Sequence, residues 1–140
     1  MKITDSTFFL LKECEGLKLK SYQCPAKVWT IAMGNTFYLD GTPVKQGDTI
    51  TMGKAIKLFY SVGAKFEKSV NELITKPLTQ HQWDVIFSIC WQYGAAWLKK
   101  SLILKQINSN PNDLKGIRTI FDKMEYDNRR NIEFKHYSIK

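Results

Sequence analysis

The spacing of apolar and polar residues first predicts a short helix. Residues 5–14 follow helical periodicity, with Asp5 or Ser6 as the expected N-cap and Gly16 as the glycine that ends the helix. The apolar positions expected to face the core are Phe8, Phe9, Leu11 and Cys14.

Strand and turn signals follow this helix. Residues 17–23 and 28–33 have the composition of two strands. Asp40-Gly41 stands between apolar residues 37–39 and 43–44, which predicts a hairpin turn. The region therefore predicts a small antiparallel sheet.

The rest of the chain has helical periodicity. Thr51 is the expected cap of a long helix over 52–74, which Lys76-Pro77 ends. Thr79 and Gln82 have capping-box spacing for a second helix that stops at Gly94. Three further helices are expected at about 97–107, 113–123 and 127–136.

These elements predict an α+β fold in one domain, residues 1–140, made of two lobes. We expect the sheet lobe at about 15–50 and the helical lobe at 1–14 and 51–140, joined by the long helix. Two lobes usually leave a cleft between them, where ligand sites tend to lie.

A net charge of +8 predicts attraction to a polyanion, either nucleic acid or the anionic bacterial envelope. The chain has no zinc-finger spacing and no RNP-like aromatic motif, so we expect no nucleic-acid partner. Near the C-terminus, an envelope-binding surface or an ordinary solvated helix face is expected from Arg118, Lys123, Arg129, Arg130, Lys135 and Lys140. Arg129 and Glu133 have the spacing of a helical ion pair.

The cysteines and the first residues predict a protein made in a reducing cytoplasm. Cys14, Cys24 and Cys90 are an odd number without CxxC spacing, and Cys14 and Cys90 fit core positions. The apolar run at 8–11 is too short for a signal peptide or a membrane span, so we expect no stable membrane insertion. No phosphate-binding, dinucleotide or metal motif appears, and we expect no cofactor and no metal.

Glu15 is the first candidate for chemistry. It stands where the first helix meets the first strand, directly before Gly16. In apolar surroundings the pKa of such a carboxyl rises, and it can then act as a general acid for glycoside cleavage. Taken alone, Glu15 is better interpreted as a surface carboxylate near a helix end.

Five short motifs, in order along nearly the whole chain, resemble those of phage-type lysozymes, the endolysins of glycoside hydrolase family 24. The family patterns EGL-x-L-x-x-Y, WTIGYGH, PLTQ-x-QFDAL, FN-x-G and RR-x-x-E are similar to residues 15–22, 28–34, 77–84, 91–94 and 129–133. The resemblance implies a lysozyme-like fold.

The resemblance also implies a catalytic triad at Glu15, Cys24 and Thr30, because the family spacing of Glu, eight residues, Asp or Cys, five residues and Thr is met. Asp is the more usual second member. We expect Glu15 to be the acid, Cys24 the second catalytic group and Thr30 a positioning residue. A thiolate requires a lowered pKa, to which Lys20 and Lys27 would contribute; otherwise Cys24 is a small residue in a decayed site.

Substrate contacts implied by the resemblance are Thr36, Trp91 and Gln92, although Trp91 reads equally as a core residue. Asn35 stands where the family usually has His, and Gln92 stands where it has Asn. The segment between Asn108 and Arg129 lacks the family's glycine-rich stretch, which weakens the expected grip on substrate.

The implied function is an endolysin, a muramidase that hydrolyses the β-1,4 bond between N-acetylmuramic acid and N-acetylglucosamine in peptidoglycan and lyses the host cell. We expect a monomer that stays in the host cytoplasm until a separate holin-like protein releases it onto periplasmic peptidoglycan. The alternatives are a catalytically impaired lysozyme-like protein that binds cell wall, and a lytic transglycosylase.

Overall fold

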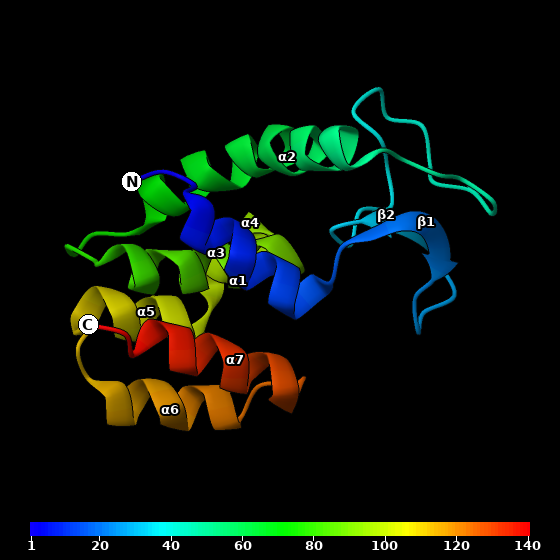
Figure 1. Cartoon of the computed structure of the whole chain (residues 1–140). Coiled ribbons are helices and arrows are strands. Elements are labelled where there is room, and N and C mark those ends of the chain that lie inside the picture. Colours follow the sequence, from blue (N-terminus) through cyan, green and yellow to red (C-terminus); the bar gives the residue numbers. More distant parts are fainter. The chain divides into compact units, whose positions relative to one another are not determined.

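The computed structural model describes residues 1–140 and contains seven helices and two strands (Figure 1). The helices are α1 (Asp5–Glu15), α2 (Met52–Leu73), α3 (Gln80–Tyr93), α4 (Ala95–Lys100), α5 (Leu102–Ser109), α6 (Leu114–Asp122) and α7 (Asp127–Tyr137), and the strands are β1 (Lys18–Gln23) and β2 (Trp29–Ala32). The predicted α+β class is confirmed. No helix is both long enough and apolar enough to cross a membrane.

The chain divides into two compact units, each described here by itself. One unit is Leu11–Ala64, and the other combines Met1–Leu10 with Lys65–Lys140.

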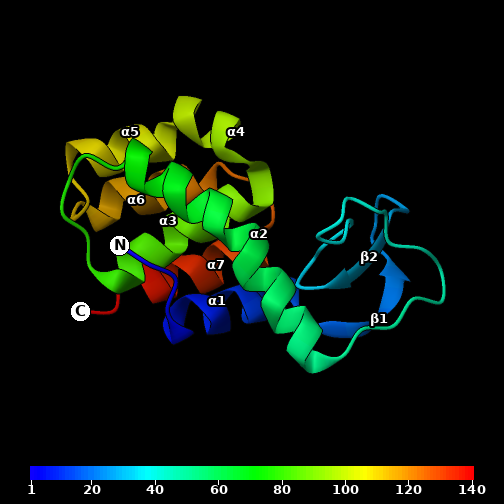
Figure 2. The same ribbon diagram turned by 90° about the horizontal axis from the view of Figure 1, so that it is seen from above.

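The Leu11–Ala64 unit is built on the antiparallel pair β1–β2 (Figure 2). Tyr22 pairs with Thr30, and the register shifts between Lys18 and Tyr22. The core of this unit joins β2 to the first turns of α2, and its buried members are Ile31, Ala32, Val44, Ala55 and Leu58.

The predicted hairpin around Asp40-Gly41 forms as a turn but not as paired strands. The N–H of Gly41 donates to the carbonyl of Tyr38 at 3.0 Å, and only an isolated bridge joins Phe37 to Pro43. The N–H of Tyr38 donates to the carbonyl of Thr42 and the N–H of Val44 donates to the carbonyl of Thr36, both at 2.9 Å, so two hydrogen bonds flank this bridge.

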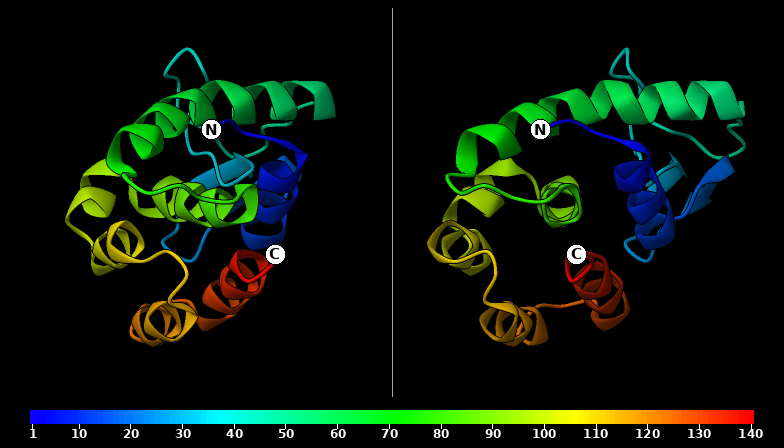
Figure 3. Two further views of the ribbon diagram at one scale, coloured as in Figure 1. Left: turned by 90° about the vertical axis from the view of Figure 1, so that its left-hand side faces the viewer. Right: turned by 60° about the vertical axis from the view of Figure 1, so that its left-hand side comes forward.

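In the other unit α3 is the central helix, because residues 82–90 are all buried. It packs against α7, and α5, α6 and α7 follow one another in a row (Figure 3). The predicted capping box is confirmed: the N–H of Gln82 donates to Thr79 Oγ1 at 3.1 Å, and the N–H of Thr79 donates to Gln82 Oε1 at 3.0 Å. Gly94, with a φ of 90°, ends the helix as predicted.

A fully buried carboxylate, Asp84 on α3, connects three helices of this unit. Its oxygens accept hydrogen bonds from Ser6 Oγ and Thr7 Oγ1 of α1, both at 2.6 Å, and from Gln80 Nε2 at 2.9 Å. His136 Nε2 of α7 lies 2.9 Å from the same carboxylate. Burial alone would raise the pKa of Asp84, but these hydrogen bonds outweigh burial and lower it.

The single helix predicted over 97–107 is wrong, because Ser101 divides it into α4 and α5. Ser101 is extended, with φ −77° and ψ 152°. Its hydroxyl accepts from the N–H of Leu104 at 3.1 Å and donates to the carbonyl of Leu98 at 2.7 Å. Serine favours such a cap over a helix interior, since its side chain satisfies backbone groups at a helix end.

Two details of the first helix also differ from the prediction. α1 begins at Asp5, so Thr4 rather than Asp5 or Ser6 precedes the helix, and the carbonyl of Thr4 accepts from Phe8 N–H at 3.1 Å. Phe9, expected in the core, is 61% exposed, whereas Leu10 is buried. The apolar run is longer than the buried face of the helix, so periodicity alone does not choose between neighbours.

Candidate functional site

Glu15 is the last residue of α1 and lies half-buried in the Leu11–Ala64 unit. Gly16 follows with a φ of 77°, and its N–H donates to the carbonyl of Lys12 at 2.8 Å. This left-handed residue ends the helix as predicted and fixes the backbone from which the carboxylate projects.

Gly34 makes room for the Glu15 carboxylate. An ideal Cβ at Gly34 would lie 2.6 Å from Oε2 of Glu15, closer than real Cβ contacts. Gly34 also has a φ of 77°, a conformation that glycine adopts without strain. The next residue, Asn35, is buried, and its Oδ1 accepts from the N–H of Met33 at 3.2 Å, which stabilises the turn that carries Gly34.

Cys24 lies in the short loop between β1 and β2. Its N–H donates to the carbonyl of Val28 at 3.0 Å, and its carbonyl accepts from the N–H of Lys27 at 2.7 Å. Thr30 is buried, and its hydroxyl donates to the carbonyl of Val28 at 3.0 Å. The loop therefore holds Cys24 close to Thr30.

The surroundings of Cys24 favour its thiolate. The main cause is hydrogen bonding from the backbone N–H of Val28, which lowers the pKa of the Cys24 thiol; Ala26 N–H and the Thr30 hydroxyl act in the same direction. The predicted help from Lys20 and Lys27 is not among the causes. Local hydrogen-bond donors rather than ammonium groups produce the shift.

Tyr22 is the functional candidate that sequence reasoning missed. It is half-buried on β1, opposite Thr30. Burial raises the pKa of Tyr22, and the negative charges of Glu15 and Cys24 raise it further. Such charge effects weaken with distance, so the phenol has both predicted catalytic groups near it. Its place at the end of the 15–22 motif was the available signal.

Thr36 belongs to the same unit as Glu15, Cys24 and Thr30. It is half-buried, and its carbonyl accepts from the N–H of Val44 at 2.9 Å.

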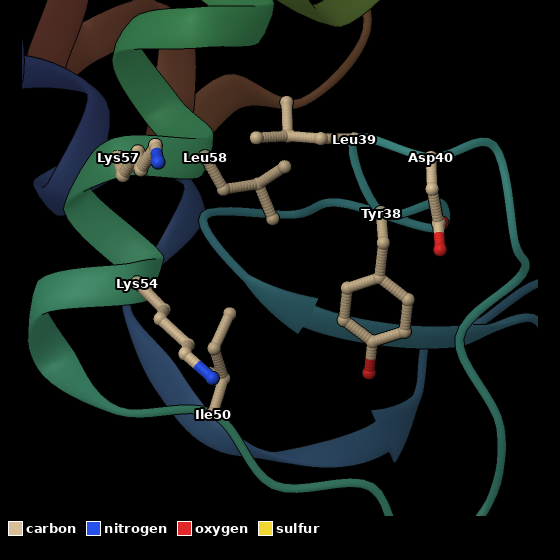
Figure 4. A pocket seen from close by; sticks show the side chains of 7 residues that line it. All are labelled: Tyr38, Leu39, Asp40, Ile50, Lys54, Lys57 and Leu58. Carbon is tan, nitrogen blue, oxygen red and sulfur yellow. The ribbon is translucent and has the colours of Figure 1, made fainter.

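A separate hollow of about 410 Å³ opens in this unit between the 38–40 turn and the start of α2 (Figure 4). Its lining residues are Tyr38, Leu39, Asp40, Ile50, Lys54, Lys57 and Leu58. None of the predicted site residues lines it. The hydroxyl of Tyr38 donates to Asp48 at 2.7 Å, so the phenol at the edge of the hollow is held in place.

Trp91 and Gln92 are at the end of α3, in the other unit. The Trp91 ring packs against Phe66 and Phe87, with centroid separations of 5.6 and 6.1 Å. The side-chain oxygen of Gln92 accepts a hydrogen bond from the guanidinium of Arg130. Substrate binding by these two residues stays a prediction.

The expectation that Arg129 and Arg130 belong to an exposed basic surface is wrong. They are 9% and 1% exposed, and Glu133 is fully buried between them. Arg130 Nε lies 2.7 Å from Glu133 Oε1, Arg129 Nε lies 3.4 Å from Oε2, and Ser88 Oγ donates to Oε2 at 2.6 Å. The predicted Arg129–Glu133 pair is therefore confirmed, but as part of a buried cluster that joins α7 to α3.

Comparison with known proteins assigns the family. The family model for phage lysozyme matches residues 12–133. The chain belongs to the phage lysozyme family. This confirms the resemblance carried by the five motifs.

Individual relatives agree with this family. An endolysin of Acyrthosiphon pisum secondary endosymbiont phage 1 is 36% identical over 108 residues, 77% of this chain and 70% of the relative. The endolysin of Salmonella phage P22 is 32% identical over 108 residues, 77% of this chain and 74% of the relative. The solved endolysin from Escherichia coli O157:H7 phage FAHEc1 superimposes with a TM-score of 0.86 at 27% identity, covering 99% of this chain and 94% of that one. The lysozyme-like fold is thus confirmed.

Proposed function

We propose that this phage lysozyme family member is an endolysin, a muramidase that hydrolyses the β-1,4 bond between N-acetylmuramic acid and N-acetylglucosamine in peptidoglycan. The observation that carries the proposal is the Glu15 carboxylate, placed at the end of α1 against Gly34 and near Tyr22. Relatives named endolysins support the same activity.

In this proposal Glu15 protonates the glycosidic oxygen as the bond to the muramic acid breaks. Cys24 is the second catalytic group, and its lowered pKa supports a thiolate that either attacks the sugar or takes a proton from the attacking water. Thr30 positions the thiol through its hydroxyl. Water supplies the new hydroxyl of the reducing sugar in either case. When the thiolate attacks, Glu15 takes a proton from the water that hydrolyses the thioglycoside, and the thiolate leaves. When the thiolate instead takes the proton of the attacking water, Cys24 ends protonated and Glu15 ionised, and exchange with solvent returns both groups to their starting states.

Thr36, Trp91 and Gln92 are proposed to contact the glycan strand. The protein is proposed to act as a monomer, to remain in the host cytoplasm, and to reach periplasmic peptidoglycan after a holin-like protein opens the membrane. The charge of +8 supports attraction to this anionic envelope.

The decisive experiment is muropeptide release from purified Gram-negative sacculi, with products identified by mass. Wild type and Glu15→Gln are compared with Glu13→Gln, which removes an exposed carboxylate from the same helix. We expect release ending in reducing muramic acid from wild type and Glu13→Gln, and a loss of more than about a hundredfold in Glu15→Gln.

Three other results would contradict the proposal. Anhydromuramic products, one water lighter, would identify a lytic transglycosylase. Muropeptide binding without release by folded wild type would identify an impaired cell-wall-binding protein. Full activity of Cys24→Ala would remove the thiol from the mechanism.

A further inference from the structure

Three lysines of the helical unit lie in a stretch without acidic residues. No Asp or Glu stands between Asp84 and Asp113, while Lys99, Lys100 and Lys105 fall within this stretch. The stretches 16–39 and 49–66 also carry three lysines each and no acidic residue, so what distinguishes Lys99, Lys100 and Lys105 is their arrangement in the fold.

The fold brings these three lysines to one place. Ser101 ends α4 and begins α5, so the last turn of α4 and the first turns of α5 share a surface (Figure 2). There Lys99, Lys100 and Lys105 line a shallow hollow of about 670 Å³, together with Ser101, Leu104, Asn108 and Ser109.

The lysines have no counterion within the protein. All three are exposed, and none forms an ion pair. The carboxylates that flank the stretch are already engaged, because Asp84 is fully buried in its hydrogen-bond network and Asp113 caps α6 by accepting from the N–H of Gly116 at 3.0 Å. A cluster of three unpaired ammonium groups attracts an external anion.

Two large apolar side chains are exposed on the same two helices. Leu102, the first residue of α5, is 63% exposed, and Trp97 on α4 is 39% exposed. The Trp97 ring is stacked on Tyr93 with centroids 4.3 Å apart, so it is held in place at the surface. Tryptophan and leucine beside lysines are the combination that enters the boundary between lipid headgroups and acyl chains.

We propose that this α4–α5 surface, defined by Trp97, Lys99, Lys100, Leu102 and Lys105, docks on a membrane that exposes anionic phospholipid. The lysines contact the phosphate headgroups, and Leu102 and the edge of Trp97 enter the outermost acyl region. A nucleic-acid partner would use the lysines alone and would leave the two apolar side chains without a role.

The test is sedimentation with vesicles of phosphatidylglycerol and phosphatidylcholine, or of phosphatidylcholine alone, without peptidoglycan. A Lys99→Gln/Lys100→Gln/Lys105→Gln variant is compared with Lys54→Gln/Lys57→Gln/Lys65→Gln, which removes the same charge from exposed positions on α2. Each lysine near an anionic surface contributes about fivefold to binding, so we expect the first variant to bind anionic vesicles about a hundredfold more weakly. The control is expected to lose only a few-fold.

A Leu102→Ser variant tests the apolar contact, and we expect it to bind several-fold more weakly with all lysines intact. Equal losses in the two triple variants would overturn the proposal in favour of attraction by net charge alone. Unchanged vesicle binding by Leu102→Ser, or no binding of wild type to anionic vesicles, would overturn it as well. Because the readout is lipid binding, it is independent of peptidoglycan cleavage.

Discussion

Replacing Gly34 with alanine is expected to displace the Glu15 carboxylate while the fold stays nearly as stable. The variant therefore tests how catalytic activity depends on the position of this carboxylate. The new methyl carbon would stand 2.6 Å from Glu15 Oε2, whereas ordinary contacts begin at 3.4 Å. The carboxylate can withdraw by roughly 0.8 Å because it ends a flexible side chain, so the clash costs little stability. At a reacting group, a misplacement of about 1 Å can cost roughly a hundredfold in rate.

The left-handed backbone adds a separate cost. An L-residue at a φ of 77° destabilises the fold by about 1 kcal/mol relative to glycine. Gly41→Ala is the matched control, because Gly41 has a φ of 84° and no atom within 4 Å of its ideal Cβ. Both variants therefore carry the same backbone strain, and only Gly34→Ala moves Glu15.

Two measurements check this reasoning. Thermal or urea unfolding is expected to show similar losses of about 1 kcal/mol in both variants. Initial rates of sacculus solubilisation are expected to fall between tenfold and a hundredfold in Gly34→Ala and to stay near wild type in Gly41→Ala. Equal activities in the two variants would refute the assignment of Gly34 as the contact that places the catalytic carboxylate.

Three further predictions concern the buried Asp84 network, the Cys24 thiol and the Ser101 helix cap. Asp84→Asn is expected to lower the free energy of unfolding by about 3 kcal/mol at pH 7. Folding lowers the pKa of Asp84, so the ionised carboxylate stabilises the fold above its unfolded pKa of about 4, and this stabilisation is lost as pH falls through the folded pKa. Urea unfolding at a series of acid pH values should therefore show that the free energy of unfolding declines less steeply in Asp84→Asn than in wild type. Alkylation of Cys24, followed in a Cys14→Ser background, should titrate below the range of a free thiol. Thr30→Val should move that midpoint slightly upward, and an unchanged midpoint would contradict the contribution of the Thr30 hydroxyl. Ser101→Ala is expected to lower the free energy of unfolding, measured by calorimetry, by about 1 kcal/mol. An unchanged free energy of unfolding would show that the cap does not stabilise the fold.

Helix ends were predictable from the sequence where the capping residues lie next to them in the chain. The capping box of Thr79 and Gln82 and the left-handed Gly94 set α3 without help from the rest of the fold. Ser101 carries a similar local signal, but the apolar pattern on both sides is continuous, so periodicity masks the break. The turn at Asp40-Gly41 is also a local signal and forms, whereas the pairing beside it is limited to the Phe37–Pro43 bridge, an extent that no local pattern specifies.

The motif spacing predicted which residues form the candidate site but not the surroundings that set their chemistry. Glu15, Cys24 and Thr30 come from that spacing. The lowered pKa of Cys24 has its main source in backbone N–H groups, which every residue except proline carries and which no sequence pattern marks. The burial of Arg130 was likewise hidden, because a basic residue on a polar helix predicts exposure unless its buried partner is known.

The hydrogen bonds that join Ser6 and Thr7 to Asp84 set an order of events during protein synthesis. Thr7 and Asp84 are 77 residues apart, and a ribosome adding about 5–20 residues per second needs roughly 4–15 seconds to cover that interval. Throughout this time the first turn of α1 is exposed without its partner, while all of Leu11–Ala64 is made in between. The helical unit therefore closes around the oldest part of the chain last, and protein made in the cell passes through a stage in which one unit is complete and the other consists of its first segment alone.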